Sequence, residues 1–260
     1  MTDKLQEGYL VNSLERGLEA LLTFLGKPEM TFSEFARASM LNKATAKRTL
    51  YTLEKHEFIK FNEHRNTYSL GIRLFELGNA AFQNFQLLKI AQPFMEKISK
   101  ELWETIILAQ RVGHEQVYLY KIECEGTVHL QTLVGKRRPL YYGLGKTILA
   151  FMSPEEQAQI VPESIPSYTI GTVTDRNTFL QSLQEVRERG YGVDEEEYIE
   201  KVIGIGAPIF ENKDVVCGLI GVTAPNVRMT CEKREIIVKY LVKASNSISY
   251  NLRNGLEQLV

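Results

Sequence analysis

The chain has 260 residues, a formal net charge of −1 and 44% hydrophobic residues, a composition typical of a globular protein with two domains. It contains no run of about 18 apolar residues, and its N-terminus lacks a basic region followed by an apolar stretch, so we expect neither a membrane span nor a signal peptide. Three widely spaced cysteines without a Cys-x-x-Cys pair favour reduced thiols in the cytoplasm. The histidines never fall at metal-ligand spacing, which leaves open only a metal site assembled from distant residues, and we expect no cofactor.

The first helical pattern is a series of leucines that ends at Gly26. Its members are Leu14, Leu18, Leu21, Leu22 and Leu25. A short helix is predicted next, because Thr31 and Glu34 have the spacing of a capping box. Phe35 and Ala36 are the apolar members of this second helix.

A third helix is predicted to begin after Asn42, which is a favourable N-cap residue. Its inner face holds Ala46, Leu50 and Leu53. Two strand-like runs, "FIKFNEH" and "NTYSLG", follow around a polar turn at residues 64–66. Three helices followed by a hairpin predict a winged helix-turn-helix over residues 8–70.

Basic side chains are concentrated on the outer face of this third helix, and residues 43–65 contain six Lys or Arg against three Glu. Such a stripe is usually a solvated face, but its place in a helix-turn-helix favours contacts with DNA phosphates and base edges. The predicted DNA-binding residues are Lys43, Ala44, Thr45, Lys47, Arg48 and Tyr51 on the helix, and Arg65 at the hairpin tip. The alternative is a winged helix that holds a partner protein, and a steep salt dependence of DNA binding would separate the two.

A mostly helical segment extends from Gly71 to about Trp103, and we expect its first part, residues 71–89, to be a linker helix. Pro93 predicts a break or a new first turn near residue 92. The apolar stripe of the segment is Leu74, Leu77, Ala81, Phe85 and Leu88. A dimer contact and burial against the same chain explain this stripe equally well.

The second half of the chain, residues 90–255, has the pattern of an α+β domain with an antiparallel sheet. Strands are predicted for "TIILAQRV", "QVYLYKIE", "TVHLQTLVG", "GIGAPIF" and "VVCGLIGVTAP". Helices are predicted for "GKTILAFM", for "RNTFLQSLQEVRERG" and for the C-terminal segment, which carries Ile237, Leu241, Ala244, Ile248 and Leu252 at helical spacing.

Three motifs resemble catalytic or nucleotide-binding sequences but are incomplete. "GLGKT" has Leu140 where a phosphate-binding loop needs its first glycine, and "GIGAP" lacks the third glycine and the helix of a dinucleotide fingerprint. The acidic run at residues 194–197 is typical of a solvated loop. No nucleophile, base and orienting group can be assembled, so we predict that the chain is not an enzyme. An enzyme with a DNA-binding appendage is the alternative, and turnover of a bound ligand would favour it.

Glycines interrupt the predicted apolar strands at four positions: Gly204, Gly206, Gly218 and Gly221. A glycine inside a strand marks a bulge or a close approach of the backbone to a ligand or a helix, and the sequence leaves both open. Thr223 falls on the same strand face as Gly221. A small polar ligand would suit such a face.

From about Leu10 to Leu252 the chain resembles the IclR family of bacterial transcription regulators. The resemblance rests on "SLERGLEALLTF", "NKATAKRTLYTLEKHEFI", "YSLGIRLFELG", "GKRRPLYYGLGKTILAFMS" and "ERGYGVDEEEYIEKVIGIGAPIFENKDVVCGLIGVTAP". It implies a winged helix-turn-helix, a linker helix and a GAF-like effector domain. It also implies a homodimer or homotetramer on a palindromic DNA operator, controlled by a small-molecule effector. It does not decide between repressor and activator.

The effector residues that the resemblance implies come from four places in the sequence: Gly143, Leu144 and Gly145, then Asp194, then Gly204, then Gly221 and Thr223. Family members often carry cysteine at the position of Gly204 and serine at that of Gly221, so we expect extra room here. Tyr141 and Tyr142 replace a frequent histidine and offer aromatic surface. We therefore expect a carboxylate effector larger than a two-carbon acid, such as a sugar acid or an aromatic acid.

Overall fold

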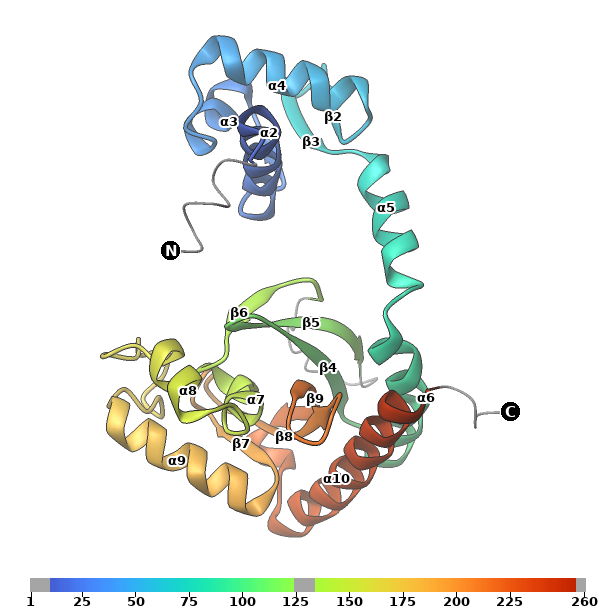
Figure 1. Cartoon of the computed structure of the whole chain (residues 1–260), viewed down its shortest axis with the longest axis vertical. Coiled ribbons are helices and arrows are strands. Elements are labelled where there is room, and N and C mark those ends of the chain that lie inside the picture. The colour runs from blue at the N-terminus through green and yellow to red at the C-terminus, as the bar shows by residue number, and fades with distance from the viewer. Residues whose placement is uncertain (1–9, 124–133, 256–260) are drawn as a thin grey trace. The chain divides into compact units, whose positions relative to one another are not determined.

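The computed structural model describes residues 10–123 and 134–255, and the chain divides into two compact units between Asn84 and Phe85. Most of the strand expected in "TVHLQTLVG" lies outside the described residues. The predicted fold class is confirmed: a helix-turn-helix with a small sheet precedes a larger antiparallel sheet covered by helices (Figure 1). Among the described residues, no helix has the length and apolar character needed to cross a membrane.

The first unit begins with three helices, α2 (Asn12–Leu22), α3 (Phe32–Ala38) and α4 (Lys43–Lys55). Both predicted caps are present: Thr31 and Glu34 form the capping box of α3, and Asn42 Oδ1 accepts the Thr45 N–H at 2.9 Å at the start of α4. A short 3₁₀ turn, η1 (Thr23–Leu25), closes α2 just before Gly26. The local signals in the sequence therefore place these helix ends correctly.

The core of the first unit is small and lies between the three helices and a three-stranded sheet. The strands are β1 (Glu29–Met30), β2 (Ile59–Asn62) and β3 (Thr67–Leu70), in the order β1-β3-β2. The buried residues are Ala20, Phe24, Met30, Phe35, Ala46, Leu50 and Ile59. Ala46 and Leu50 thus form the inner face predicted for α4, which directs the opposite face of the helix toward solvent.

Helix α5 (Ile72–Phe82) ends the first unit and has no buried residue. Ile72, Phe75 and Leu77 are exposed over 57%, 70% and 51% of their surfaces. The expected break near residue 92 is wrong, because the chain leaves helical structure at residues 83–85 and α6 (Gln86–Leu102) continues through Pro93. The side chains of α6 on both sides of Pro93 are buried against one sheet face, and this burial outweighs the cost of about 3 kcal/mol that a proline imposes inside a helix.

The second unit is built on a six-stranded antiparallel sheet with the strand order β6-β5-β4-β9-β8-β7. Its strands are β4 (Thr105–Val112), β5 (Glu115–Ile122), β6 (Arg137–Pro139), β7 (Gly192–Glu195), β8 (Val202–Phe210) and β9 (Val216–Pro225). The long central strands β8 and β9 are apolar on both faces, as expected for strands that are covered by helices on both sides.

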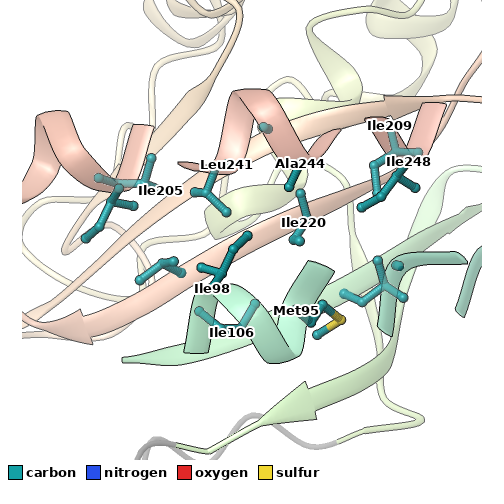
Figure 2. Packing of buried hydrophobic residues seen from close by; sticks show 14 of the residues in the cluster. Met95, Ile98, Ile106, Ile205, Ile209, Ile220, Leu241, Ala244 and Ile248 are labelled. Carbon is teal, nitrogen blue, oxygen red and sulfur yellow. The ribbon is translucent and has the colours of Figure 1, made fainter. Parts of the chain in front are cut away.

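One face of this sheet packs against α6 and against α10 (Cys231–Asn254). Figure 2 shows Met95 and Ile98 of α6 and Leu241, Ala244 and Ile248 of α10 directed toward the strand residues Ile106, Ile205, Ile209 and Ile220. The helical spacing predicted for the C-terminal segment is therefore confirmed, with Leu252 at the half-buried end.

The other face packs against a 3₁₀ turn and three helices, and this side holds the second hydrophobic core. These elements are η2 (Gly143–Gly145), α7 (Lys146–Leu149), α8 (Pro154–Ile160) and α9 (Arg176–Arg189). The predicted helix at "GKTILAFM" is only four residues long, while α9 matches its prediction. A short 3₁₀ turn, η3 (Asn226–Arg228), connects β9 to α10.

Candidate functional site

In the first unit, the residues predicted to bind DNA lie on the solvent face of α4 and at the β2–β3 tip. The side chains of Lys43, Ala44, Lys47, Arg48 and Tyr51 are exposed, and Thr45 is half-buried next to the N-cap. Among the described residues, no carboxylate pairs with Lys43, Lys47 or Arg48. The cationic charge of this helix face is therefore available to an external anion.

The tip between β2 and β3 differs from α4 because its cation has a partner. Arg65 Nη1 lies 3.2 Å from Glu29 Oε2, and the Arg65 N–H donates to Asn62 Oδ1 at 3.1 Å. Both side chains of the ion pair are exposed, so the pair contributes little to stability and a phosphate could replace Glu29. The hairpin therefore positions Arg65, and the guanidinium remains accessible to an external anion.

In the second unit, a cavity of about 350 Å³ lies on the sheet face that carries η2 and α7. Five of the seven residues predicted to bind an effector line it: Gly143, Leu144, Asp194, Gly204 and Thr223. The register explains why they meet, since Asp194 pairs with Gly204, and Gly204 with Thr223, across β7, β8 and β9. Residues in such a row point to the same face of the sheet.

Gly145 and Gly221 do not line the cavity, and their missing side chains serve packing. A Cβ atom at Gly145 would lie 2.6 Å from both Gln116 Nε2 and the Leu140 carbonyl oxygen, and one at Gly221 would lie 2.8 Å from Leu144 Cδ1. The expected extra room is therefore absent at Gly221. At Gly204 the Leu144 side chain occupies most of the expected space, because a Cβ atom there would lie 3.1 Å from Leu144 Cγ.

A second row of glycines allows η2 and α7 to approach the sheet. Gly192 pairs with Gly206, and Gly206 with Gly221, so three adjacent strands lack a side chain on one line. Thr147 and Leu144 occupy that line, and a Cβ at Gly192 would overlap Thr147 Oγ1. Of the two explanations that the sequence left open, close packing of a helix therefore accounts for this row.

Asp194 is the acidic residue of the cavity, and burial raises its pKa from 3.8 to about 6, assisted by the charge of Glu197. Two effects oppose this shift: the Glu197 N–H donates to Asp194 Oδ1 at 2.8 Å, and Lys146 adds positive charge nearby. Lys146 is itself buried in an ion pair with Glu197. The acidic run is therefore not simply a solvated loop, because its first and last members are engaged on the cavity side.

Aromatic residues that the sequence did not single out form much of the cavity wall. Tyr118, Tyr168 and Tyr198 line it, whereas the predicted Tyr142 packs behind two of them, with ring centroids 4.4 Å from Tyr168 and 5.8 Å from Tyr198. Burial raises the pKa of Tyr118 to about 12, so its hydroxyl stays protonated and can donate. Tyr141, the other predicted tyrosine, packs against the core below η2.

Two loops position the wall tyrosines. Thr169 Oγ1 donates to the Glu196 carbonyl and Thr172 Oγ1 to the Glu197 carbonyl, both at 2.6 Å. The loop that carries Tyr168 is thereby attached to the loop that carries Tyr198. Tyr118 and Tyr168 have no local signal in the sequence, because only the pairing of distant segments brings them to the cavity.

The remaining polar groups of the cavity are two cations and one hydroxyl. Lys136 and Arg138 line it from the β5–β6 side, and the Arg138 guanidinium lies 5.8 Å from the centre of the Tyr198 ring. Thr223 Oγ1 is buried and has no hydrogen-bond partner within the described structure. A cavity with aromatic walls, cations without a carboxylate partner in the described parts of the chain and a hydroxyl without a described partner is suited to a small polar ligand with negative charge.

Comparison with known proteins places both units in one family. The IclR helix-turn-helix domain matches residues 13–63, and the C-terminal domain of the bacterial transcriptional regulator IclR matches residues 79–250. The HTH-type transcriptional regulator KipR of Bacillus subtilis is 32% identical over 236 residues, which cover 90% of this chain and 94% of KipR.

Solved structures agree with this result. An IclR transcriptional regulator from Alicyclobacillus acidocaldarius superposes with a TM-score of 0.85 at 25% identity, covering 94% of this chain and all of that one. An IclR homologue from Microbacterium hydrocarbonoxydans, solved in complex with 4-hydroxybenzoate, has the same fold, with a TM-score of 0.82 at 24% identity and 94% and 100% coverage. The chain belongs to the IclR family of bacterial transcriptional regulators.

Proposed function

We propose that this DNA-binding regulator binds a palindromic operator as a dimer or a higher oligomer, and that a small-molecule effector in the second unit controls its binding. The observation that carries the DNA-binding part is the exposed face of α4. It presents Lys43, Lys47 and Arg48 without carboxylate partners among the described residues, next to Tyr51, which is 69% exposed. A helix with this face in the major groove provides cations for phosphates and side chains for base edges.

Control by an effector is supported by the cavity and by one of the structural neighbours. The cavity combines aromatic walls with two cations that have no described carboxylate partner and with the Thr223 hydroxyl, which has no described hydrogen-bond partner; this is the usual character of a site for a small molecule. The Microbacterium homologue holds 4-hydroxybenzoate. An effector changes DNA affinity only if it binds the free and the DNA-bound states with different affinities.

Footprinting of the purified chain on fragments of its own genome tests the DNA-binding part. We expect protected palindromic sites, and a binding constant that falls steeply with salt, with a slope reduced by about one unit for each lost phosphate contact. Lys47→Ala should weaken binding at these sites. Lys97→Ala is the matched control, since Lys97 is an exposed lysine on α6 in the other unit. Equal binding by both variants and the parent would contradict the proposed α4 surface.

The oligomer is supported by the apolar surface of α5. A helix-turn-helix reads a palindrome only as a symmetric pair, and α5 exposes Phe75 and Leu77 with no cover from the described part of its own unit. We expect light scattering to show at least a dimer at micromolar concentration. Leu77→Glu should shift it to smaller species, because a charge in an apolar contact has no partner.

Asn79→Glu is the control for that experiment, since it adds the same charge to α5 at an exposed polar position. A monomeric parent would contradict the proposed oligomer. An oligomer that is unaffected by Leu77→Glu would place the contact away from α5.

A further inference from the structure

The cavity of the second unit carries a charge gradient across the sheet. Arg138 belongs to β6 and Asp194 to β7, the two edge strands of the six-stranded sheet. Thr223 lies between them on β9. A ligand in this cavity therefore meets cations at one end, a hydroxyl in the middle and a carboxyl group at the other end.

The cations at the first end can bind an external anion. Neither Lys136 nor Arg138 pairs with a carboxylate within residues 10–123 and 134–255, although the adjacent Arg137 pairs with Glu115 at 3.3 Å. Backbone contacts hold their strand in place, since Tyr118 and Lys136 are joined by an N–H···O bond of 3.3 Å. A guanidinium has five donors, and Arg138 uses Nη1 on the Arg137 carbonyl at 3.2 Å, which leaves donors for a carboxylate.

The hydroxyl in the middle requires a partner. Leaving a buried hydroxyl without a hydrogen bond costs about 1–3 kcal/mol, and Thr223 Oγ1 has no partner among residues 10–123 and 134–255. A ligand carboxylate could accept from it, but that would bring negative charge toward Asp194 and away from Arg138. A ligand hydroxyl carries no such penalty, because it can both donate and accept.

The walls favour a flat ligand. Tyr118, Tyr168 and Tyr198 offer ring surfaces, and a cavity of about 350 Å³ is near the lower limit of ligand sites, which suits a single ring. We propose that the effector is a monocyclic aromatic acid with a hydroxyl group, whose carboxylate binds Arg138 and Lys136 and whose hydroxyl binds Thr223. This inference rests on the proposed control by an effector, and it names the ligand class and the residues that select it.

Calorimetry with the full chain, three aromatic probes and one sugar acid tests the proposal. The aromatic probes are 4-hydroxybenzoate, benzoate, which lacks the hydroxyl, and 4-hydroxybenzamide, which lacks the charge. We expect 4-hydroxybenzoate to bind at least about tenfold more tightly than either of the others, which corresponds to about 1.4 kcal/mol for each lost contact. Gluconate, a hydroxylated acid without a ring, should bind more weakly than 4-hydroxybenzoate.

Two variants assign the contacts. Arg138→Gln should remove the preference for 4-hydroxybenzoate over 4-hydroxybenzamide, and Thr223→Val should remove the preference for 4-hydroxybenzoate over benzoate. Arg137→Gln is the matched control, since Arg137 is next to Arg138 on β6 but does not line the cavity. Thr223→Ser retains the hydroxyl and should retain the preference. Lys136→Gln replaces Arg138→Gln if that variant does not fold.

Several outcomes would overturn the proposal. One is that none of the aromatic acids binds at about 10 mM, a concentration at which even weak affinities of about 3 kcal/mol are detected. Another is that gluconate binds more tightly than 4-hydroxybenzoate, and a third is that both preferences survive in Arg138→Gln and Thr223→Val. If the parent chain binds its operator but none of these acids, this inference is wrong and the DNA-binding part of the proposed function stands. If the chain binds the acids but no operator, the ligand class stands and the DNA-binding part of the proposed function is wrong.

Discussion

The α4 face and the cavity are built in opposite ways. The α4 face comes from one continuous helix whose functional side chains are exposed and make few contacts with the rest of the chain. The cavity takes its walls from all six strands of the sheet, from η2 and from the loops that carry Lys136, Tyr168 and Tyr198, and Asp194 and Leu144 are buried. Function on the first surface is therefore nearly independent of stability, whereas function in the cavity depends on how η2 and α7 pack on the sheet.

Gly221→Leu should have the largest effect, because it fills the space that Leu144 occupies. A side chain at Gly221 would meet Leu144 Cδ1 at 2.8 Å and the Ile205 carbonyl oxygen at 3.1 Å, and a strand backbone cannot move away cheaply. We expect the free energy of unfolding of the second unit to fall by about 3 kcal/mol. The only tryptophan, Trp103, lies in this unit, so urea unfolding followed by its fluorescence reports the change.

Gly78→Leu provides the contrasting measurement in the first unit. Gly78 is in the middle of α5, and nothing lies within 4 Å of a Cβ atom there. Leucine is the better helix former, so stability should rise by about 0.5–1 kcal/mol. If both substitutions had the same effect, the packing role assigned to Gly221 would be wrong.

Asp194→Asn should reveal the cost of a buried carboxylate. The pKa of Asp194 is about 6 in the folded chain and near 3.8 when unfolded, so between these values the folded state holds its proton more tightly. Its charge is thus neutralised in both states below about pH 3 and penalises the folded state fully above about pH 7. The gain in unfolding free energy from Asp194→Asn should be larger at pH 8 than at pH 4, by about 2 kcal/mol.

Asp175 serves as a control, because folding lowers its pKa whereas folding raises the pKa of Asp194. Hydrogen bonds from the side chain and the backbone N–H of Thr178 lower the pKa of Asp175, which caps α9. Its stabilising contribution is therefore present above its unfolded pKa and is lost as the pH falls. Asp175→Asn retains a cap and should flatten the acid limb of the stability curve. A pH profile of Asp194→Asn parallel to that of the parent would contradict the raised pKa.

The sequence predicts the two surfaces to different degrees, and the reason is the range of the interactions. The ends of α3 and α4 follow from Thr31 and Asn42, which act on N–H groups three residues away. The end of α5 was not predicted, because the continuity of α6 across Pro93 depends on the sheet face that it covers. Local patterns do not contain that contact.

The cavity shows the same limit at the level of single residues. Asp194, Gly204 and Thr223 were expected there through a family resemblance, and the strand register places them in one row. Tyr118 and Tyr168 were not expected, because they are separated by 50 residues and meet only through the folded sheet and its loops. Lys136 and Arg138 had a visible signal in "GKRRPL", but their direction depends on the pairing of β6 with β5.

Arg48→Ala should affect binding but not stability, which is the behaviour expected of the α4 face. Arg48 is exposed and makes no ion pair with a described residue, so its removal should change the unfolding free energy by less than about 0.5 kcal/mol. Operator affinity should fall by about 1–3 kcal/mol if Arg48 reads a base, and the salt slope should fall by about one if it binds a phosphate. Titration of a footprinted operator at several salt concentrations separates these cases. A large loss of stability would show that Arg48 belongs to the core of the unit instead.

Thr31→Ala should have a small effect, and Ser153→Ala makes the same change in the other unit. Thr31 Oγ1 accepts the Glu34 N–H at 3.4 Å, while the Thr31 N–H donates to Glu34 Oε2 at 2.9 Å. The second unit repeats this capping box at the start of α8, where the Ser153 hydroxyl accepts the Glu156 N–H at 3.2 Å and the Ser153 N–H donates to Glu156 Oε2 at 3.1 Å. Each substitution to alanine leaves one helical N–H without its partner and should cost about 1 kcal/mol in its own unit. Trp103 fluorescence follows urea unfolding of the second unit, and the part of the circular dichroism change that does not coincide with it reports the first unit. Thr31→Ser retains the accepting oxygen and should cost much less than Thr31→Ala.

Equal losses of unfolding free energy in the two units would show that a capping box stabilises its helix equally on either side of residue 84. The contrast between the two surfaces would then arise from long-range packing alone. A cost at Ser153 several times that at Thr31 would mean that even this cap depends on its tertiary surroundings.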